Sequence, residues 1–457
     1  MLAMLTGWLS SALSALSALP VLVKVLASLA LILIANRLVK ELLVSILAVT
    51  LLLGLWFGHS LSAVGAIAWG RFREPDNLLL VAVLLLVIWL SSLMAEGGVM
   101  RDLVETVRSR VPKRLAFAAL PAVIGFLPMP GGAVFSAPMV DSADPEGRLS
   151  GLLKAQTNHW YRHIWEYWWP LYPGVILALE LTRLEVWQFI LVQLPVTLIA
   201  AGSGALLLLR RIPRAVAPGG APSSGVAGPA ASPANRSQPR RSFLSLMAPI
   251  LTVVVVFALL QVLFPGLQRV SRYVPMAAGL FLALAVLQWQ RRLPLSAWLK
   301  AMFSWRALQI TLLVVVVRIY GAVIEAPLPD GVFPVDLLRR ELALFGIPDA
   351  LLVAFLPFIC GFTMGSTVGY VGASFPLALS LLGPAPSLGR LAATTVLAFG
   401  FGFMGELLSP VHICLVVTAE YFHIRLLRSL YSLIAPALLV LAGVTLWQFA
   451  LRWLLPG

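Results

Sequence analysis

Two groups of residues recur about half a chain apart, and this duplication limits how the chain can fold. The motif Leu-Pro-x-x-x-Gly-Phe begins at Leu120 and again at Leu356, displaced by 236 residues. Three more residues recur with a displacement of 240: Glu166, Pro170 and Glu180 return as Glu406, Pro410 and Glu420. An internal duplication predicts two structurally similar halves, so a feature of one half should have a counterpart in the other.

The composition is typical of a membrane protein. Hydrophobic residues make up 60% of the 457 residues and charged residues only 11%, and the mean hydropathy is +0.94. Soluble proteins carry about a quarter charged residues. Apolar runs that cross a bilayer must be helical, because no water satisfies their backbone, and the alternating pattern of a membrane barrel is absent from the sequence. The two cysteines, Cys360 and Cys414, indicate neither a disulfide framework nor a cysteine metal cluster.

We expect five membrane-spanning helices in each half. They are placed at 20–36, 41–57, 78–95, 159–181 and 185–209, and at 243–264, 274–290, 307–324, 397–418 and 429–451. Between the third and fourth span of each half lies an apolar stretch broken by Gly and Pro, at 115–140 and 350–382, which we interpret as a re-entrant hairpin. The segments 96–114 and 330–346 mix charged and apolar residues and are expected to lie along the membrane surface.

Basic residues determine the predicted orientation. The formal net charge of +14 is spread over short loops, which argues against a nucleic-acid partner. Loops on one side of the predicted spans hold 21 Lys and Arg, and loops on the other side hold 9. The richer side faces the cytoplasm. Because five spans is an odd number, the second half is inverted: the first hairpin enters from the cytoplasm and the second from outside.

The predicted fold class is an all-α polytopic membrane protein with two inverted repeats of five transmembrane helices, each with a re-entrant helical hairpin and a discontinuous helix. The first repeat covers 20–210 and the second 243–457. Residues 1–19 form an apolar segment, expected to be an interfacial helix, with an additional span as the alternative. Residues 211–242, rich in Pro, Gly, Ala and Ser, are expected to be a flexible cytoplasmic linker.

The two hairpin tips are the first candidate site. In the first tip, Pro130, Gly131 and Gly132 cannot continue a helix. The helix that restarts after them carries Ser136 and would present free N–H groups to the middle of the membrane. The second tip, Gly365-Ser366-Thr367, adds hydroxyl groups. Helix N-termini attract anions, so both tips are predicted to bind substrate. The alternative is that these small residues only allow close helix packing.

The fourth span of each repeat contains a proline, which releases the carbonyl four residues before it. Pro170 would free the carbonyl of Glu166, and Pro410 that of Glu406. A loose carbonyl, an intramembrane carboxylate and a bent backbone together suit Na⁺ or a coupling proton. We therefore predict ion-coupling roles for Glu166, Glu406, Arg162, His163 and Ser409. The alternative for Glu166 is a structural ion pair with Arg162, four residues earlier.

A histidine pair could also bind a metal. His159, His163 and Glu166 share one face of a helix, which is a spacing that suits a metal site. The sequence lacks His-Glu-x-x-His and supplies no further ligand close by. We therefore expect no bound metal.

Two further polar residues of the second half are candidates for substrate binding. Arg318 lies inside a predicted span and is expected to be a countercharge for the substrate or for Glu406, with snorkelling toward the outer face as the alternative. His412 is expected to hydrogen-bond within the site. A packed neutral histidine is the alternative.

Two long motifs resemble a known family. They read Phe126-Leu127-Pro128-Met129-Pro130-Gly131-Gly132-Ala133-x-Phe135-Ser136-Ala137-Pro138-Met139 and Arg162-His163-x-Trp165-Glu166-Tyr167-x-Trp169-Pro170-Leu171-Tyr172-Pro173-Gly174. The chain is similar, over about residues 24–452, to the prokaryotic integral-membrane family called domain of unknown function four hundred and one. That family is grouped with the ion transporter superfamily, whose better-known members move carboxylates such as citrate, gluconate, lactate and C4-dicarboxylates. In those relatives two opposed hairpins and two broken helices enclose the site, often with Ser-Asn-Thr at a tip. The tips of this chain depart from Ser-Asn-Thr, and the resemblance implies an anionic substrate.

The sequence thus predicts a secondary transporter that moves a small, carboxylate-like organic anion together with Na⁺ or H⁺ by alternating access. No Walker A motif is present in the sequence, so ATP is not an internal energy source. We expect a prokaryotic inner (cytoplasmic) membrane as the location, no cofactor other than Na⁺ and no nucleic-acid partner, and a homodimer is left open. Two alternatives remain: an intramembrane metal-dependent enzyme using His159, His163 and Glu166, and a translocator of lipids or lipid phosphates.

Overall fold

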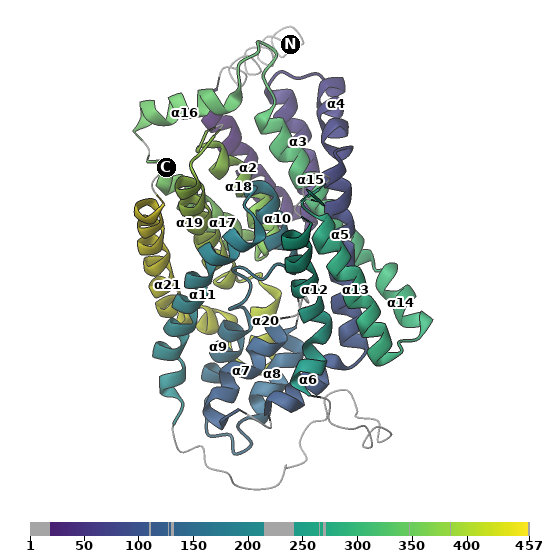
Figure 1. Ribbon diagram of the computed structural model, residues 1–457. Helices are drawn as coiled ribbons and strands as arrows, with labels where there is room; N and C mark the ends of the chain where they lie inside the picture. Colours follow the sequence, from purple (N-terminus) through teal and green to yellow (C-terminus); the bar gives the residue numbers. More distant parts are fainter. Residues whose placement is uncertain are drawn as a thin grey trace, which may run out of the picture.

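The computed structural model describes residues 19–108, 111–126, 128, 132–213, 242–264, 266–267, 271–346, 348–383 and 385–455. All regular secondary structure in these ranges is helical (Figure 1). The predicted tip residues Pro130 and Gly131, the N-terminal segment up to residue 18 and most of the predicted linker, 214–241, lie outside the described residues.

Both halves contain the same succession of helices. Each has two apolar helices, a short helix, a third apolar helix, an amphipathic helix, a hairpin, a broken helix and a final apolar helix. The first half comprises α2 (Val21–Val39), α3 (Leu42–Trp56), α4 (Leu61–Phe72), α5 (Pro75–Glu96), α6 (Val99–Arg108), α7 (Lys113–Gly125), α8 (Ala133–Ser142), α9 (Gly151–Arg162), α10 (Pro173–Thr182), α11 (Val186–Leu207) and the short η1 (Leu209–Arg211). The second comprises α12 (Phe243–Leu263), α13 (Val274–Arg291), α14 (Leu295–Met302), α15 (Trp305–Glu325), α16 (Pro334–Phe345), α17 (Asp349–Met364), α18 (Thr367–Ser380), α19 (Leu388–Leu407), α20 (Ile413–Tyr421) and α21 (Leu426–Leu454).

Ion pairs between helices of the two halves mark the two ends of the molecule. At one end, Asp102 pairs with Arg291 at 2.6 Å and Glu96 with Lys300 at 3.1 Å. At the other end, Arg71 pairs with Glu325 at 3.0 Å. The amphipathic helices α6 and α16, which occupy equivalent places in the two halves, lie at opposite ends (Figure 1). The two repeats are therefore inverted relative to each other, as predicted.

The predicted spans agree with the structure except where a helix is short or broken. In the described residues, seven helices are long and apolar enough to cross a membrane: α2, α5, α11, α12, α15, α19 and α21. The predicted span at 41–57 is α3, with only 15 residues. The span at 274–290 is α13, whose last turn is polar. The short helices α4 and α14 were not predicted, because each has too few residues to produce a spanning pattern.

The fourth span of each repeat is interrupted ahead of its proline. In the first repeat α9 ends at Arg162 and α10 resumes at Pro173, and in the second α19 ends at Leu407 and α20 resumes at Ile413. The discontinuity predicted from the prolines is therefore present. The predicted loose carbonyl of Glu406, however, accepts a hydrogen bond from the N–H of Ser409 at 3.0 Å. A local turn satisfies this carbonyl, so the expectation that it is loose was wrong.

The duplicated glycine lets each hairpin approach its broken helix. A Cβ atom on Gly125 of α7 would clash with the carbonyl oxygen of Arg162, and one on Gly361 of α17 with that of Gly402. The same side of α19 also carries Gly405, whose Cβ would meet the carbonyl of Phe358. Glycine is required at these crossings because two backbones touch there without a side chain between them.

Aromatic residues of the break satisfy the end of α7. The last carbonyls of a helix have no intrahelical partner, and in a membrane they need a donor from the protein. The ring N–H of Trp165 donates to Ala122 at 2.8 Å, and that of Trp169 donates to Phe126 at 2.9 Å. The Tyr172 hydroxyl donates to Gly125 at 2.5 Å. These aromatic residues anchor the first hairpin to the break.

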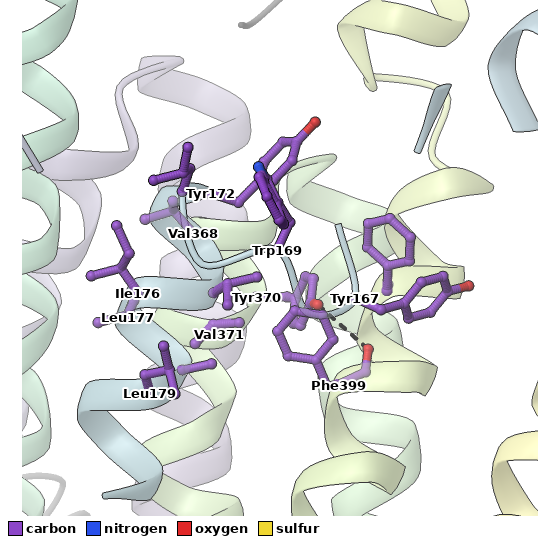
Figure 2. Close-up of a cluster of buried hydrophobic side chains, with 14 of the residues drawn as sticks. Tyr167, Trp169, Tyr172, Ile176, Leu177, Leu179, Val368, Tyr370, Val371 and Phe399 are labelled. Carbon is purple, nitrogen blue, oxygen red and sulfur yellow. Dashed lines mark hydrogen bonds between the residues drawn. The ribbon is translucent and has the colours of Figure 1, made fainter. Parts of the chain in front are cut away.

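The two repeats share a core beside these breaks. Figure 2 shows α10 of the first repeat beside α18 of the second, with Ile176, Leu177 and Val371 in one buried cluster. Tyr167 stacks edge-on against Phe403 of α19, with ring centroids 4.6 Å apart. Because these side chains are fully buried, the breaks and the second hairpin are held against a packed surface.

The inverted topology can be tested by cysteine labelling. Single cysteines at Ser223 and at Glu105 should react with an impermeant thiol reagent from the cytoplasm, and one at Asp336 only from outside. The native Cys360 and Cys414 are both buried, but Cys414 lines a cavity, so both are replaced first and the cysteine-free protein gives the background. If positions 223 and 336 react from the same side, the two repeats cannot be inverted.

Candidate functional site

A cavity of about 500 Å³ lies where the second hairpin meets the two breaks. Eight of the predicted site residues line it: Arg162, His163, Glu166, Gly365, Ser366, Thr367, Glu406 and His412. Because these residues come from both repeats, the duplicated features of the sequence converge on one space. Pro128, just ahead of the first tip, also lines it.

Arg162 provides a buried positive charge in the wall of this cavity. Only 2% of the residue is exposed, and its guanidinium lies 3.4 Å from the carboxylate of Glu166. The ion pair that the sequence suggested for these two residues is therefore present. A Cβ atom on Gly132 would lie 2.7 Å from the guanidinium, so the glycine allows Arg162 to sit directly beneath the start of α8.

The second tip turns sharply at Gly365. Its φ of +60° is a left-handed conformation that favours glycine, and a Cβ atom there would lie 2.9 Å from the backbone nitrogen of His412. The carbonyl of Gly365 faces Nδ1 of His412 at 3.1 Å. The tip is thus joined directly to the break of the second repeat.

Glu406 lies beneath this tip and is held by two side chains. Its carboxylate accepts a hydrogen bond from the Thr367 hydroxyl at 2.8 Å and lies 3.5 Å from Nδ1 of His412. Only 4% of Glu406 is exposed. The carboxylate therefore has one partner in the hairpin, Thr367, and one in the break, His412. A change in the charge of Glu406 would alter its interaction with both.

Three helices begin at the cavity with their first N–H groups unsatisfied within the helix. Their first turns contribute Pro173 and Gly174 of α10, Thr367 and Val368 of α18, and Ile413 and Cys414 of α20. The N-cap residues Tyr172, Ser366 and His412 make no side-chain capping hydrogen bond. The positive ends of these helices and Arg162 together favour an anion.

Three histidines also meet at this place. His159 of α9, His163 in the turn after it and His412 of the second repeat have ring centroids 4.8 to 5.3 Å apart. His412 thus lies at the site, as predicted, with His163 Nε2 3.1 Å from its own Nε2.

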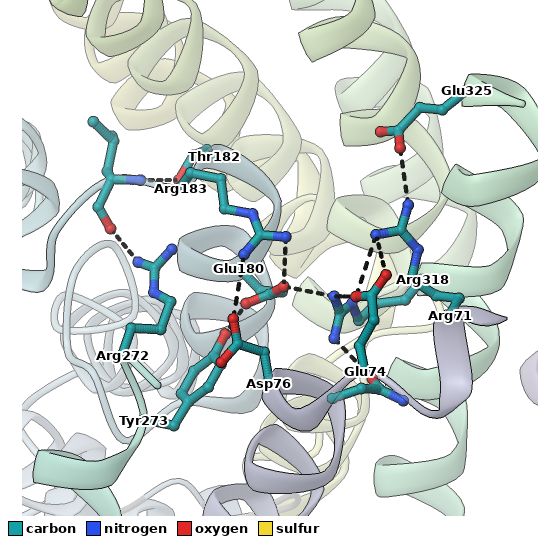
Figure 3. Close-up of polar contacts among 12 residues, drawn as sticks. Arg71, Glu74, Asp76, Glu180, Thr182, Arg183, Arg272, Tyr273, Arg318 and Glu325 are labelled. Carbon is teal, nitrogen blue, oxygen red and sulfur yellow. Dashed lines mark hydrogen bonds and ion pairs between the residues drawn. The ribbon is translucent and has the colours of Figure 1, made fainter. Parts of the chain in front are cut away.

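Arg318 is not part of the cavity wall and lies instead in a network of charged side chains (Figure 3). Its guanidinium pairs with Glu180 and with Glu74, each at 2.9 Å, and donates to Asn77 at 2.9 Å. Figure 3 also shows Arg183 and Tyr273 in contact with Glu180. The expectation that Arg318 is a countercharge for the substrate or for Glu406 was wrong, because Arg318 is not part of the cavity wall and the repeated acidic residue Glu180 is its partner.

Two further predicted residues are buried outside the cavity wall. Ser409 is fully buried, and its hydroxyl accepts a hydrogen bond from the N–H of Val411 at 3.3 Å. Ser136 is also fully buried, and its hydroxyl has no hydrogen-bond partner in the described part of the chain. Neither is part of the cavity wall.

Sequence reasoning missed the polar residues of the cavity mouth. Ser91 and Ser92 of α5 line it, as do Ser304, Arg306 and Gln309 at the start of α15. Ser91 and Ser92 stand out in the sequence as a polar pair inside an otherwise apolar span, and this pair could have indicated that α5 lines a cavity. Arg306 is exposed, so the cavity reaches the surface at the end where α15 begins. By the distribution of basic residues, this end is the predicted cytoplasmic side.

The fold is similar to that of a solved transporter structure. The crystal structure of the YdaH transporter of Alcanivorax borkumensis, described as having an unusual topology, aligns with a TM-score of 0.53 and 15% sequence identity. The alignment covers 90% of this chain and 97% of that chain. At this level of identity the similarity shows the fold alone. No curated protein matches the sequence.

A family model covers most of the chain. The family described as "Protein of unknown function (DUF401)" matches residues 22–219 and 233–451. The short gap between the two matched segments falls inside the predicted linker. The resemblance predicted from the two long motifs is therefore confirmed, and the chain belongs to the DUF401 family.

Proposed function

We propose that this protein is a secondary transporter of a small organic anion with a carboxylate group. The observation that carries the proposal is the combination of buried Arg162 with three helix N-termini around one cavity built from both repeats. A volume of about 500 Å³ is within the usual range for small-molecule sites. The similarity in fold to a protein named as a transporter agrees with this class and argues against an enzyme.

The charges of the cavity support coupling to a cation. With both carboxylates ionised, Glu166 and Glu406 outweigh the single charge of Arg162. An anion that enters such a buried site is repelled unless a cation enters too or a carboxylate takes up a proton. We therefore propose Na⁺ or H⁺ as the coupling ion. Glu406 is the group that pairs with the Na⁺ or takes up the proton.

The two ends of the molecule differ in a way that suits alternating access. The cavity reaches the surface at the end of α15 that carries Arg306. Toward the other end, Arg318 of the second repeat pairs with Glu180 and Glu74 of the first and ties the repeats together. We propose that this conformation is open to the cytoplasm and closed to the outside.

Uptake into proteoliposomes tests the function directly. Purified protein should concentrate at least one acid from a panel of radiolabelled mono- and dicarboxylates when a Na⁺ or proton gradient is imposed. Liposomes that lack protein are the control. Absence of uptake for all acids, with folded protein and both gradients, would rule out the proposed substrate class.

The second tip is expected to be intolerant of a side chain. Gly365→Ala forces a left-handed alanine at a cost of about 1–2 kcal/mol and places its Cβ against the break, so uptake should be lost. Gly98→Ala is the matched control, because Gly98 also has a positive φ of +70° but has nothing within 4 Å of its Cβ position. It should lose comparable stability and keep uptake. Equal uptake in both variants would count against a role of the tip.

Glu406→Gln tests the coupling step. Glutamine keeps the hydrogen bond from Thr367 but carries no charge, so uphill uptake should stop while the protein stays folded. Concentrative uptake at the wild-type level would remove Glu406 from the coupling mechanism.

Glu166→Gln should instead lower thermal stability, because it leaves Arg162 buried without its carboxylate partner. The cost of breaking a buried pair is about 3–5 kcal/mol. The double variant with Arg162→Gln should recover stability but not uptake, since it also lacks the proposed anion-binding charge. Recovery of both would show that the pair is purely structural.

A further inference from the structure

Three buried histidines converge from the two repeats. His159 and His163 come from the first repeat and His412 from the second, and each offers a ring nitrogen within 4.8 Å of the others. No more than 6% of any of the three is exposed. The sequence suggested His159, His163 and Glu166 as metal ligands and supplied no further ligand close by. The fold supplies it from 249 residues farther along the chain.

Backbone carbonyls fix which nitrogen of each ring carries a proton. Nδ1 of His163 lies 2.6 Å from the carbonyl of His159, and Nδ1 of His412 lies 3.1 Å from that of Gly365. Nε2 of His159 lies 3.1 Å from the carbonyl of Leu407. Because a carbonyl can only accept, each of these nitrogens must donate. A neutral imidazole has one donor, so the opposite nitrogen of each ring carries a lone pair.

The three rings lie close together, and the lone pairs of His159 and His412, unlike that of His163, face no donor group suited to them. Nε2 of His163 faces Nε2 of His412 at 3.1 Å, although neither can donate to the other. Nδ1 of His159 is buried and has no hydrogen-bond partner in the described part of the chain. Two such nitrogens on a tetrahedral metal lie about 3.4 Å apart, given metal–nitrogen distances of about 2.1 Å. A cation between the rings would satisfy all three.

We propose that His159, His163 and His412 bind one divalent transition metal ion of the Zn²⁺ type. Metal-ligating histidines usually donate their other ring N–H to a carbonyl or carboxylate, and all three rings do so here. Neutral imidazoles suit zinc and related metals rather than Ca²⁺ or Mg²⁺, which prefer oxygen. His163 and His412 line the cavity, so the fourth coordination position faces it. Three ligands and an open position form a site that can also accept a carboxylate.

The charged neighbours are compatible with a bound cation. The carboxylate of Glu166 lies 3.8 Å from Nε2 of His163, and the carboxylate of Glu406 lies 3.5 Å from Nδ1 of His412. These two carboxylates offset the charge of a bound ion, which neutral imidazoles do not, so the negative excess that supports cation coupling applies to the metal-free site. Arg162 competes, since its Nη1 lies 2.9 Å from His163 Nε2. When the metal takes this lone pair, the guanidinium keeps Glu166 as its partner.

Metal binding to the full-length protein tests the site without any transport assay, so its outcome is separate from that of the proposed function. The protein is purified without a polyhistidine tag, stripped with EDTA and titrated with Zn²⁺ or Co²⁺. We expect one ion per chain, with the visible absorption of tetrahedral Co²⁺. His412→Gln and His163→Gln should each weaken binding about tenfold or more.

His423→Gln is the matched control, because His423 is exposed in the turn after α20 and lies outside the cluster. It should bind metal as the wild type does. Since the ligands join the two repeats, Zn²⁺ should raise the unfolding temperature of the wild type and of this control but not of His412→Gln. If His412→Gln does not fold, His159→Gln replaces it. Absence of stoichiometric binding, or equal affinity in His412→Gln and His423→Gln, would overturn the site.

Discussion

The architecture depends on satisfying backbone groups where helices stop inside a membrane. A helix that ends in hydrocarbon exposes carbonyls that water cannot reach, and each unsatisfied group costs several kcal/mol. At the end of α7 these carbonyls accept hydrogen bonds from Trp165, Trp169 and Tyr172. The same aromatic run belongs to the interrupted fourth span. One interruption of the first repeat therefore stabilises the other, so the hairpin and the broken helix form one unit.

The unit of hairpin and broken helix explains why the motif Leu-Pro-x-x-x-Gly-Phe is duplicated. Its glycine occurs in both copies, as Gly125 and Gly361. Each of these glycines lies where the backbone of a hairpin touches the backbone of a broken helix. The sequence alone could reveal the duplication, the inversion and the two hairpins, because they follow from repeated motifs, from the number of apolar spans and the basic residues of their loops, and from Pro or Gly. It could not reveal why the glycine is needed, since that depends on a contact with the carbonyl of Arg162, 37 residues away.

The candidate site was likewise predicted only in part, because some of its contacts join residues that are distant in the sequence. Intramembrane charges such as Glu166, Glu406 and Arg162 stand out in an apolar sequence, and the cavity brings them together. The partner of Arg318 could not be chosen from the sequence, because Glu180 and Glu406 lie in separate helices and either was available. The histidine cluster escaped prediction because its third member, His412, comes from the other repeat. Residue spacing identifies ligands on one helix but not across a repeat interface.

The repeated glutamates differ in their surroundings, and the difference fits the proposed alternating access. Glu180 is 2% exposed and paired with Arg318, whereas its counterpart Glu420 is exposed at the opposite end. Inverted repeats that adopt identical conformations would place both residues in equivalent environments. In the proposed conformation one end is closed by the network that joins the repeats, and the other is open to the cavity. An exchange of conformations between the repeats would reverse this relation, since each end is built from the same elements in the opposite orientation.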